Sequence, residues 1–205
     1  MNLRVTRGDP QEYQDLDTRK TYFSVSQCLT VLDPKAFEGI DPFVLSAAQD
    51  RGKNLHVIFA LRILAEMGLG PMPKYPSGVI GKYCVGIETF VTLRKPRAIR
   101  VEASGVNNKL GIAGTLDLHC WIDGENDEQW IIDLKSGPER AVHSAQLVGG
   151  YKRLSGSENA RRYGSLYITK EGKQHLQEHT HNHVDQSWFD GGLSVLNGRR
   201  YHNIK

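Results

Sequence analysis

Residues 111–136, GIAGTLDLHCWIDGENDEQWIIDLKS, carry the sequence pattern that most strongly indicates the fold. Apolar residues alternate with other residues in its two halves, 111–122 and 128–136, and a period of two is typical of β-strands. The turn-forming residues DGEND, at 123–127, separate the halves, so we predict a β-hairpin. A β-rich run just before it, AIRVEAS at 98–104, extends the prediction to a meander of three strands.

Regions on both sides of this meander repeat apolar residues at helical spacing. They are 41–67, which opens with the start signal Asp-Pro, 139–154 and 186–196. A Pro- and Gly-rich loop is expected over 71–83, then a short helix or strand over 85–93, and a strand over 161–169 followed by a turn and a short strand. We therefore predict a single α/β domain over 1–205, with a central mixed β-sheet flanked by helices.

Composition excludes several classes of protein. The chain has 205 residues, of which 39% are hydrophobic and 24% charged, as in ordinary globular domains. No apolar run approaches the roughly 18 residues of a membrane span, and the polar N-terminal segment lacks the apolar stretch of a secretory signal. We therefore expect a cytoplasmic protein with no membrane association, in the host cytoplasm if a phage encodes it. The net charge of +3 is too small to predict a polyanionic partner by itself.

The three cysteines, Cys28, Cys84 and Cys120, are scattered and show no C-x-x-C spacing. An odd number of isolated cysteines encodes neither a disulfide framework nor a cysteine-rich metal site. We expect reduced, buried thiols and no iron–sulfur cluster.

Charged side chains interrupt the second strand of the hairpin, where burial of an unpaired charge is costly. In WIIDLK, 130–135, the period of two places Asp133 and Lys135 on one face. In GTLDLHC, 114–120, Asp117 lies beside Asp133 if the acidic faces of the hairpin coincide. Adjacent carboxylates repel, and a hard cation such as Mg²⁺ relieves the repulsion while keeping positions for water and a phosphate oxygen. The pattern indicates metal-assisted phosphodiester hydrolysis, in which Lys135 orients or deprotonates water.

Carboxylate-x-lysine triplets also occur elsewhere in the chain, so the triplet alone is weak evidence. Asp33-Pro-Lys35 and Glu171-Gly-Lys173 fall in predicted turns, where they are best interpreted as solvated residues. Only Asp133-Leu-Lys135 lies in an apolar strand. A plain ion pair at the end of a strand is the competing interpretation of that triplet.

The order of several motifs resembles the PD-(D/E)XK nuclease superfamily. The motifs are Glu102, GTLD at 114–117, DLK at 133–135, and Gln146 with Tyr151 on the following predicted helix. Upstream, RGKNLH at 51–56 is similar to the R-G-x-x-x-H motif of the RecB-like, phage-type exonucleases, a group that includes the mitochondrial genome maintenance exonuclease. The resemblance covers roughly residues 22–151, with weaker similarity over 187–196, and implies a restriction-endonuclease-like core.

The resemblance also implies a role for each matching residue. Asp117 and Asp133 would be the central metal ligands, Lys135 the catalytic lysine, and Glu102 an acid that binds metal or positions water. The remaining implied roles are a metal ligand from a helix for His56, a backbone carbonyl ligand for Leu134, and positioning of the site and the nucleic-acid backbone for Gln146 and Tyr151.

One spacing departs from the family pattern. The usual spacing is Q-x-x-x-Y, whereas QLVGGY at 146–151 has one residue more. On an α-helix one residue turns a side chain by about 100°, so Tyr151 is expected to be less well placed than Gln146.

The implied activity is a Mg²⁺-dependent deoxyribonuclease, with Mn²⁺ as a substitute. We expect an exonuclease that hydrolyses linear or single-stranded DNA in replication, recombination or phage genome processing, and that acts alone, as a homo-oligomer or with a recombination partner protein. The alternative is a catalytically silent nucleic-acid-binding module on the same fold. A third hypothesis, a metal-responsive interaction protein, rests on the run His179, His181 and His183, which would place three imidazoles on one strand face.

Two further alternatives remain open from the sequence. Glu88 competes with Glu102 as the accessory acid, because a helix could also bring it to the site. Lys152, Arg153, Arg161 and Arg162 follow the active-site helix and either contact phosphates or form a solvated face.

Overall fold

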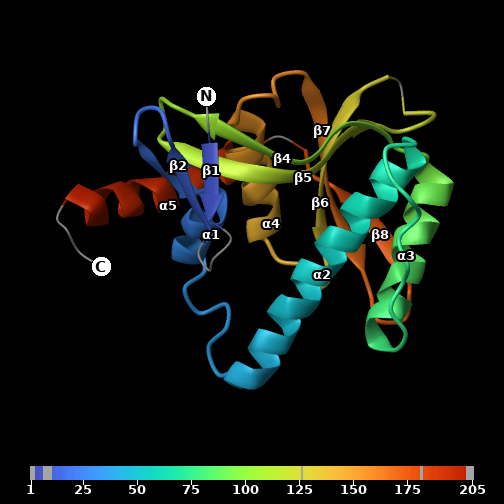
Figure 1. The fold of residues 1–205 in the computed structure, drawn as a ribbon. Coiled ribbons are helices and arrows are strands. Elements are labelled where there is room, and N and C mark those ends of the chain that lie inside the picture. The colour runs from blue at the N-terminus through green and yellow to red at the C-terminus, as the bar shows by residue number, and fades with distance from the viewer. Residues whose placement is uncertain (1–2, 7–10, 126, 181, 202–205) are drawn as a thin grey trace.

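An eight-stranded mixed β-sheet forms the centre of the molecule in the computed structural model, which describes residues 3–6, 11–125, 127–180 and 182–201 (Figure 1). The strands are β1 (Leu3–Thr6), β2 (Glu12–Asp15), β3 (Thr21–Ser24), β4 (Arg97–Asn107), β5 (Ile112–Trp121), β6 (Gln129–Lys135), β7 (Ala160–Ile168) and β8 (Gln174–Glu178). The helices are α1 (Val25–Leu32), α2 (Pro42–Glu66), α3 (Val79–Arg94), α4 (Val142–Ser144), the π-helix η1 (Ala145–Gly150), the 3₁₀-helix η2 (Tyr151–Arg153) and α5 (His183–Tyr201).

Strand β5 organises the sheet. β4 pairs with it in antiparallel orientation along one edge, and β3 (parallel) and β6 (antiparallel) share its other edge. Beyond β6 the order continues with β7 (parallel) and β8 (antiparallel), and beyond β3 with the antiparallel strands β2 and β1. The predicted meander of β4, β5 and β6 and the predicted mixed sheet are therefore confirmed.

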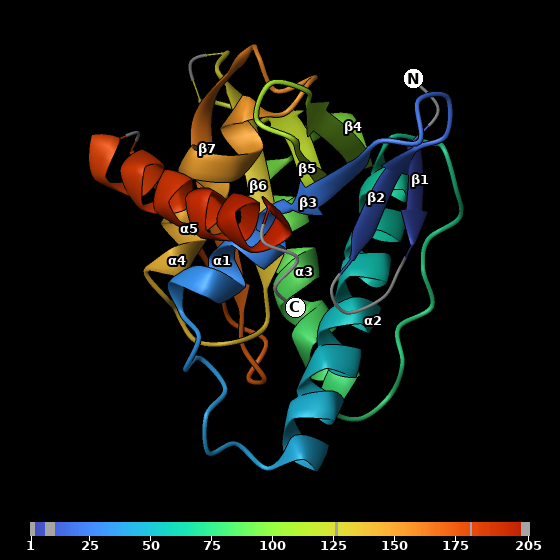
Figure 2. The same ribbon diagram turned by 90° about the vertical axis from the view of Figure 1, so that its left-hand side faces the viewer.

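Helices cover both faces of the sheet (Figure 2). Helices α2 and α3 pack on one face around a core that includes Trp130, Ile132 and Leu134 of β6. Helices α1 and α5 and the η1 turn pack on the other face, around a core that includes Ile131. The alternation of β6 side chains follows the predicted period of two, and it assigns Asp133 and Lys135 to the face of α1 and α5.

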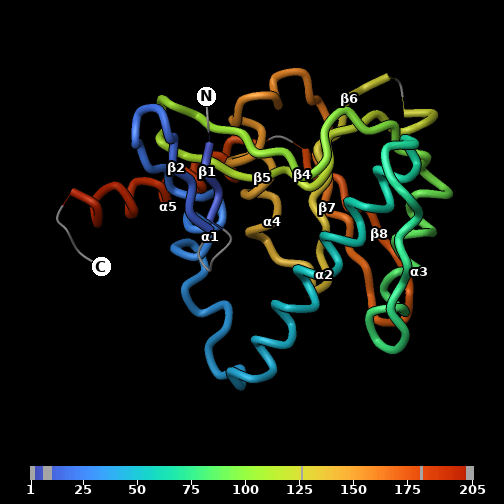
Figure 3. The backbone as a smooth tube through the Cα atoms, viewed as in Figure 1, coloured from blue at the N-terminus to red at the C-terminus, as the bar shows by residue number. Residues whose placement is uncertain are grey.

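Local signals account for the ends of the first two helices. Ser24 and Gln27 form a capping box at the start of α1, each side chain accepting the backbone N–H of the other residue. Asp41 caps α2 and Pro42 occupies its first turn. Figure 3 traces the chain from α1 to the start of α2, whose first turns extend beyond the sheet in Figures 1 and 2.

Several predicted boundaries are wrong. Residues 79–83 belong to α3 and not to the loop, which makes 85–93 part of a helix. The helix predicted from residue 139 begins at Val142 and changes to π-helical geometry at Ala145. The strands before residue 25 were not predicted, because each is only four residues long, which is too short for an alternation such as that of LRVT in β1 to stand out. Within the described residues, no helix is both long and apolar enough to cross a membrane.

Candidate active site

The candidate site lies at a gap along one edge of β5. On this edge β3 pairs with Ile112 and Ala113, and β6 pairs with Leu118 to Trp121. Within the described chain, the residues between them, 114–117, have no strand partner on this edge. The β5–β6 ladder thus stops at Leu118, the residue that follows Asp117. The Asp117 carboxylate Oδ2 accepts the Leu134 backbone N–H at 2.7 Å. A carboxylate takes the place of a backbone partner where the two strands separate.

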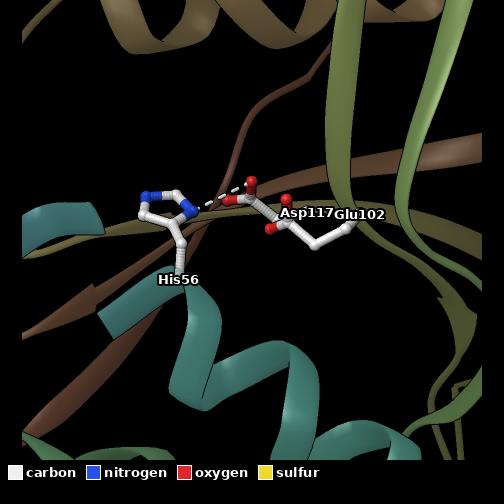
Figure 4. A group of neighbouring side chains, drawn as sticks. All are labelled: His56, Glu102 and Asp117. Atoms are coloured by element: carbon white, nitrogen blue, oxygen red, sulfur yellow. Dashed lines mark ion pairs between the residues drawn. The ribbon is translucent and has the colours of Figure 1, made fainter. Parts of the chain in front are cut away.

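Three elements bring candidate ligands to this gap (Figure 4). His56 comes from α2, Glu102 from β4 and Asp117 from β5, and one ligand atom of each lies within 4.8 Å of the others. His56 Nδ1 is 3.0 Å from Asp117 Oδ1, and the Asp117 side chain is only 8% exposed. The structure therefore brings together three of the residues that the sequence analysis named as metal ligands or accessory acids.

Glu102 reaches the gap with an unusual backbone conformation. Its neighbours Val101 and Ala103 pair with Leu118 and Leu116, which places Glu102 opposite Asp117. Its φ is 46°, in the left-handed region, which costs a non-glycine residue roughly 1–2 kcal/mol. A strained residue in a strand beside charged side chains is typical of functional sites.

A second group of side chains continues the site from β6. The Lys135 ammonium forms an ion pair with Asp133 and donates to Gln146 Oε1 at 2.8 Å. Gln146 Nε2 donates to the Tyr151 hydroxyl at 2.9 Å and to Asp133 Oδ1 at 3.3 Å. Because an ammonium only donates hydrogen bonds, it fixes which end of the Gln146 amide faces it. Four of the six residues predicted from the sequence to be catalytic or positioning groups thus form one network.

The π-helix resolves the irregular spacing before Tyr151. In η1 the Tyr151 N–H donates to the carbonyl of Gln146, five residues earlier, as in a π turn. The wider turn takes up the additional residue, so the two side chains meet on one face and do not diverge by about 100°. The expectation that Tyr151 is poorly placed is therefore wrong, and its physical reason is the π turn.

Charges in the gap shift the pKa values of its residues. Burial by itself lowers the pKa of His56, but the adjacent Asp117 carboxylate outweighs burial and raises that pKa to about 9. Burial raises the pKa of Asp117, but His56 and the Leu134 N–H hold it below its usual value. Burial, together with the charge of Asp117, raises the pKa of Asp133 despite the opposing effect of Lys135. The two buried carboxylates therefore each depend on a nearby positive charge.

His56, Glu102 and Asp117 form a group that could hold a metal ion, and Asp133 is not one of these three. As whole residues, Asp117 and Asp133 are 6% and 2% exposed. Each has a basic partner within the chain, His56 for Asp117 and Lys135 for Asp133. Buried carboxylates that need positive charge suit Mg²⁺ and Mn²⁺, whereas imidazole is a ligand of transition metals. By these preferences Mn²⁺ would accept both the imidazole and the carboxylates as ligands, and Mg²⁺ would accept the carboxylate oxygens.

The competing acid and the histidine run lie elsewhere. Glu88 accepts hydrogen bonds from Arg62 and from the Tyr75 hydroxyl, and it is not in the group that gathers at the gap. His179 follows β8 and bonds Ser165 Oγ at 2.9 Å, whereas His183 opens α5. The two do not share a strand face, so that expectation is wrong for them, and the third histidine of the run, at 181, is outside the described residues.

Tyr13 is a site neighbour that the sequence analysis did not single out. It lies on β2, is 1% exposed, and its hydroxyl is 2.9 Å from Thr115 Oγ1. Burial raises its pKa to about 12, and the carboxylates of Glu102 and Asp117 act in the same direction. The sequence gives it little signal, because β2 is only four residues long and Tyr13 is its single apolar residue.

Comparison with known proteins adds little to this geometry. No family model matches the chain, and no curated protein matches it. Among solved structures the chain is similar to SSO0001, with 15% sequence identity over 85% of this chain and 75% of that chain, and a TM-score of 0.39. A similarity this distant carries no functional conclusion for this chain.

Proposed function

We propose that the protein is a Mg²⁺-dependent deoxyribonuclease, for which Mn²⁺ can substitute, and that it acts as an exonuclease on DNA ends or single strands. The observation that carries the proposal is the sheet gap, where His56, Glu102 and Asp117 converge. The Asp133–Lys135–Gln146 network continues the same site. The motif order that resembles PD-(D/E)XK nucleases supports phosphodiester hydrolysis, and the narrower resemblance of RGKNLH at 51–56 to RecB-like exonucleases supports the choice of DNA ends.

Asp117, Asp133 and Glu102 would hold the cation through carboxylate oxygens, and His56 through its imidazole once it has lost its proton. The cation supplies positive charge that polarises the phosphate and lowers the pKa of water. Binding would therefore replace the charge that His56 now provides to Asp117.

Lys135 supplies the remaining chemistry from the chain. Its ammonium is held between Asp133 and Gln146 Oε1, with the side chain 20% exposed, so it is fixed in position yet can reach a substrate. In that place it donates a hydrogen bond to the attacking water or to the phosphate oxygens as negative charge develops. A preorganised donor of this kind acts most strongly in the transition state.

Degradation of end-labelled DNA tests the proposal. Linear single-stranded, linear double-stranded and closed circular DNA are incubated with the wild-type chain and with Asp133→Asn, in Mg²⁺, in Mn²⁺ and in chelator. We expect loss of linear DNA only, in either metal, and none with chelator or with Asp133→Asn. Cleavage of the closed circular DNA would show an endonuclease and would overturn the proposed action at DNA ends.

The binding module predicts a different result. It would retain DNA in a mobility-shift assay and cleave no substrate in either metal. Intact DNA in every reaction, with DNA still bound, would overturn the proposed hydrolysis and favour that alternative.

A further inference from the structure

The π-helical turn η1 is held from two sides by neighbouring helices. A Cβ on Gly149 would lie 2.5 Å from Cβ of Phe189 on α5, and a Cβ on Gly150 would lie 2.6 Å from Cγ1 of Val25 on α1. Both distances are shorter than real Cβ contacts, so these two positions require glycine for the turn to pack as it does. The wider turn and its close packing therefore depend on each other.

Arg153 adds a polar clamp to the same turn. Its guanidinium Nε donates to the backbone carbonyl of Gly149, and its NH2 group is 2.6 Å from Asp190 Oδ1 on α5. The guanidinium also lies 5.2 Å from the ring centre of Phe189. These three contacts direct the Arg153 side chain toward α5 and the turn, and a π turn leaves a carbonyl that benefits from such a donor.

We infer that the η1 turn, clamped by Arg153 and Asp190 and packed on Val25 and Phe189, positions the Lys135 ammonium through Gln146. The turn sets Gln146 and Tyr151 on one face, the Tyr151 hydroxyl fixes the Gln146 amide, and the amide oxygen holds Lys135. Arg153 is thus a positioning residue and not a phosphate contact, although it belongs to a basic run.

The inference rests on the proposed nuclease function for its kinetic test, which uses Arg153→Met and Asp190→Asn. Met keeps most of the apolar stem of Arg153 and removes the donors. Because a displaced catalytic group slows the chemical step, we expect each variant to lower kcat about fivefold to tenfold and to leave KM for linear DNA within twofold. Arg161→Met is the matched control, since among the described residues the Arg161 guanidinium donates to the carbonyl of Glu158, at 3.4 Å, and not to the turn or to α5.

A role of Arg153 in binding phosphate predicts the opposite pattern. Arg153→Met would then raise KM, reduce the salt dependence of DNA binding and leave kcat unchanged, and Asp190→Asn would not reproduce it. That result overturns the inference.

A volume exchange tests the turn itself. Gly150→Ala introduces a methyl group against Val25, and Val25→Ala removes the methyl groups that it meets. We expect Gly150→Ala to lower kcat about tenfold and the double variant to recover to within about threefold of wild type. Val25→Ala alone, which loosens the packing without a clash, should lower kcat by no more than about threefold. Gly191→Ala is the control, because a Cβ there meets open space. If the double variant shows no recovery, the turn does not set the site.

A measurement independent of catalysis separates the two proposals. The side-chain amide resonance of Gln146, identified by its loss in Gln146→Ala, should shift in Arg153→Met and Gly150→Ala and stay in place in Arg161→Met and Gly191→Ala. This result would support the positioning role even if the wild-type chain cut no DNA, which would overturn only the proposed function. If the resonance is unchanged in both Arg153→Met and Gly150→Ala, the positioning role is overturned, whether or not the chain cleaves DNA.

Discussion

The β5–β6 hairpin has a paired half and an open half, and the two halves are built from the same kinds of strand residue. In the paired half, Leu118 and Ile132 face each other in a regular ladder, and both are 0% exposed. On the side of this pair away from the hairpin turn, the next residues are Asp117 and Asp133, which occupy the open half. There the Leu134 N–H donates to a carboxylate instead of a backbone carbonyl. The paired half stabilises the sheet, whereas the open half stores unfavourable charge that a bound cation would relieve.

Loss of the lysine should have very different effects in the two triplets Asp133-Leu-Lys135 and Asp33-Pro-Lys35. Lys135→Ala removes the ammonium held in the open half and should lower the rate of DNA hydrolysis about 10²- to 10⁴-fold. Lys35→Ala is the matched control, because that lysine has an 82% exposed side chain and its ion pair to Glu38 spans 3.9 Å. Initial rates on linear DNA measure both variants. Equal rates in Lys135→Ala and wild type would remove Lys135 from the chemistry.

The next effect belongs to the paired half and concerns stability. Ile132→Ala leaves a cavity beneath the ladder and should reduce the free energy of unfolding by about 2–5 kcal/mol. Urea unfolding measures the loss. The rate of hydrolysis per folded molecule should remain within about fivefold, and a loss as large as that of Lys135→Ala would show that the two halves are not separable.

A cation should stabilise the open half. At a Mn²⁺ concentration 100 times its Kd, binding to the native state contributes about 2.7 kcal/mol, which raises the Tm of a domain of this size by roughly 5–10 °C. Asp117→Asn should abolish the rise. Asp50→Asn should keep it, because Asp50 is an exposed residue of α2 whose side chain is 69% accessible. A larger rise in Zn²⁺ than in Mn²⁺ that persists in Asp117→Asn would point to a different metal site.

The charge pair in the open half predicts a pH dependence of stability in metal-free protein. The pKa of His56 is raised to about 9 in the native state and is about 6.5 in the unfolded state. The native state therefore binds more protons between these values, and the stabilisation by His56 is complete below about pH 6.5 and is lost as the pH rises through about 9.

Urea unfolding in chelator at pH 6.5 and pH 9.5 tests this dependence. The wild type should lose more stability over this range than His56→Gln. If the two proteins show the same change, the ion pair of His56 with Asp117 does not contribute.

The smallest effect concerns the backbone of Glu102. Glu102→Gly relieves the left-handed conformation and removes a carboxylate from the gap, and Glu102→Ala removes the carboxylate alone. We expect the Gly variant to be more stable than the Ala variant by up to about 1 kcal/mol, with both showing weaker Mn²⁺ binding. Thermal unfolding and metal titration compare them, and a Gly variant less stable than the Ala variant would mean that Glu102 carries no strain.

The sequence predicted the parts of the fold that depend on local periodicity. The alternation in residues 128–136 predicted β6 and its two faces, and helical spacing predicted α2 to within a residue at each end. Asp117, Asp133 and Lys135 could be named because charge is rare in an apolar strand. The resemblance to nucleases added His56, Glu102 and Gln146, all of which lie in the same region of the structure.

The rest of the site depends on tertiary contacts. The separation of β5 from β6 beyond Leu118 arises because β3 takes part of the same edge, and β3 is too short to show a pattern. The π turn depends on Val25 and Phe189, which are far away in sequence from Gly149 and Gly150. Neither feature has a local signal that a period or a motif could detect.

Anomalous scattering from Mn²⁺ tests whether the open half of the hairpin binds a cation. Crystals grown with Mn²⁺ are compared with crystals grown in chelator, using diffraction data collected at the manganese edge. We predict a peak in the gap, at coordination distance from Asp117 and at least one of His56, Glu102 and Asp133, that is absent with chelator. A protein saturated with Mn²⁺ that shows no peak in the gap, or a peak only at the histidines near residue 179, would contradict the account.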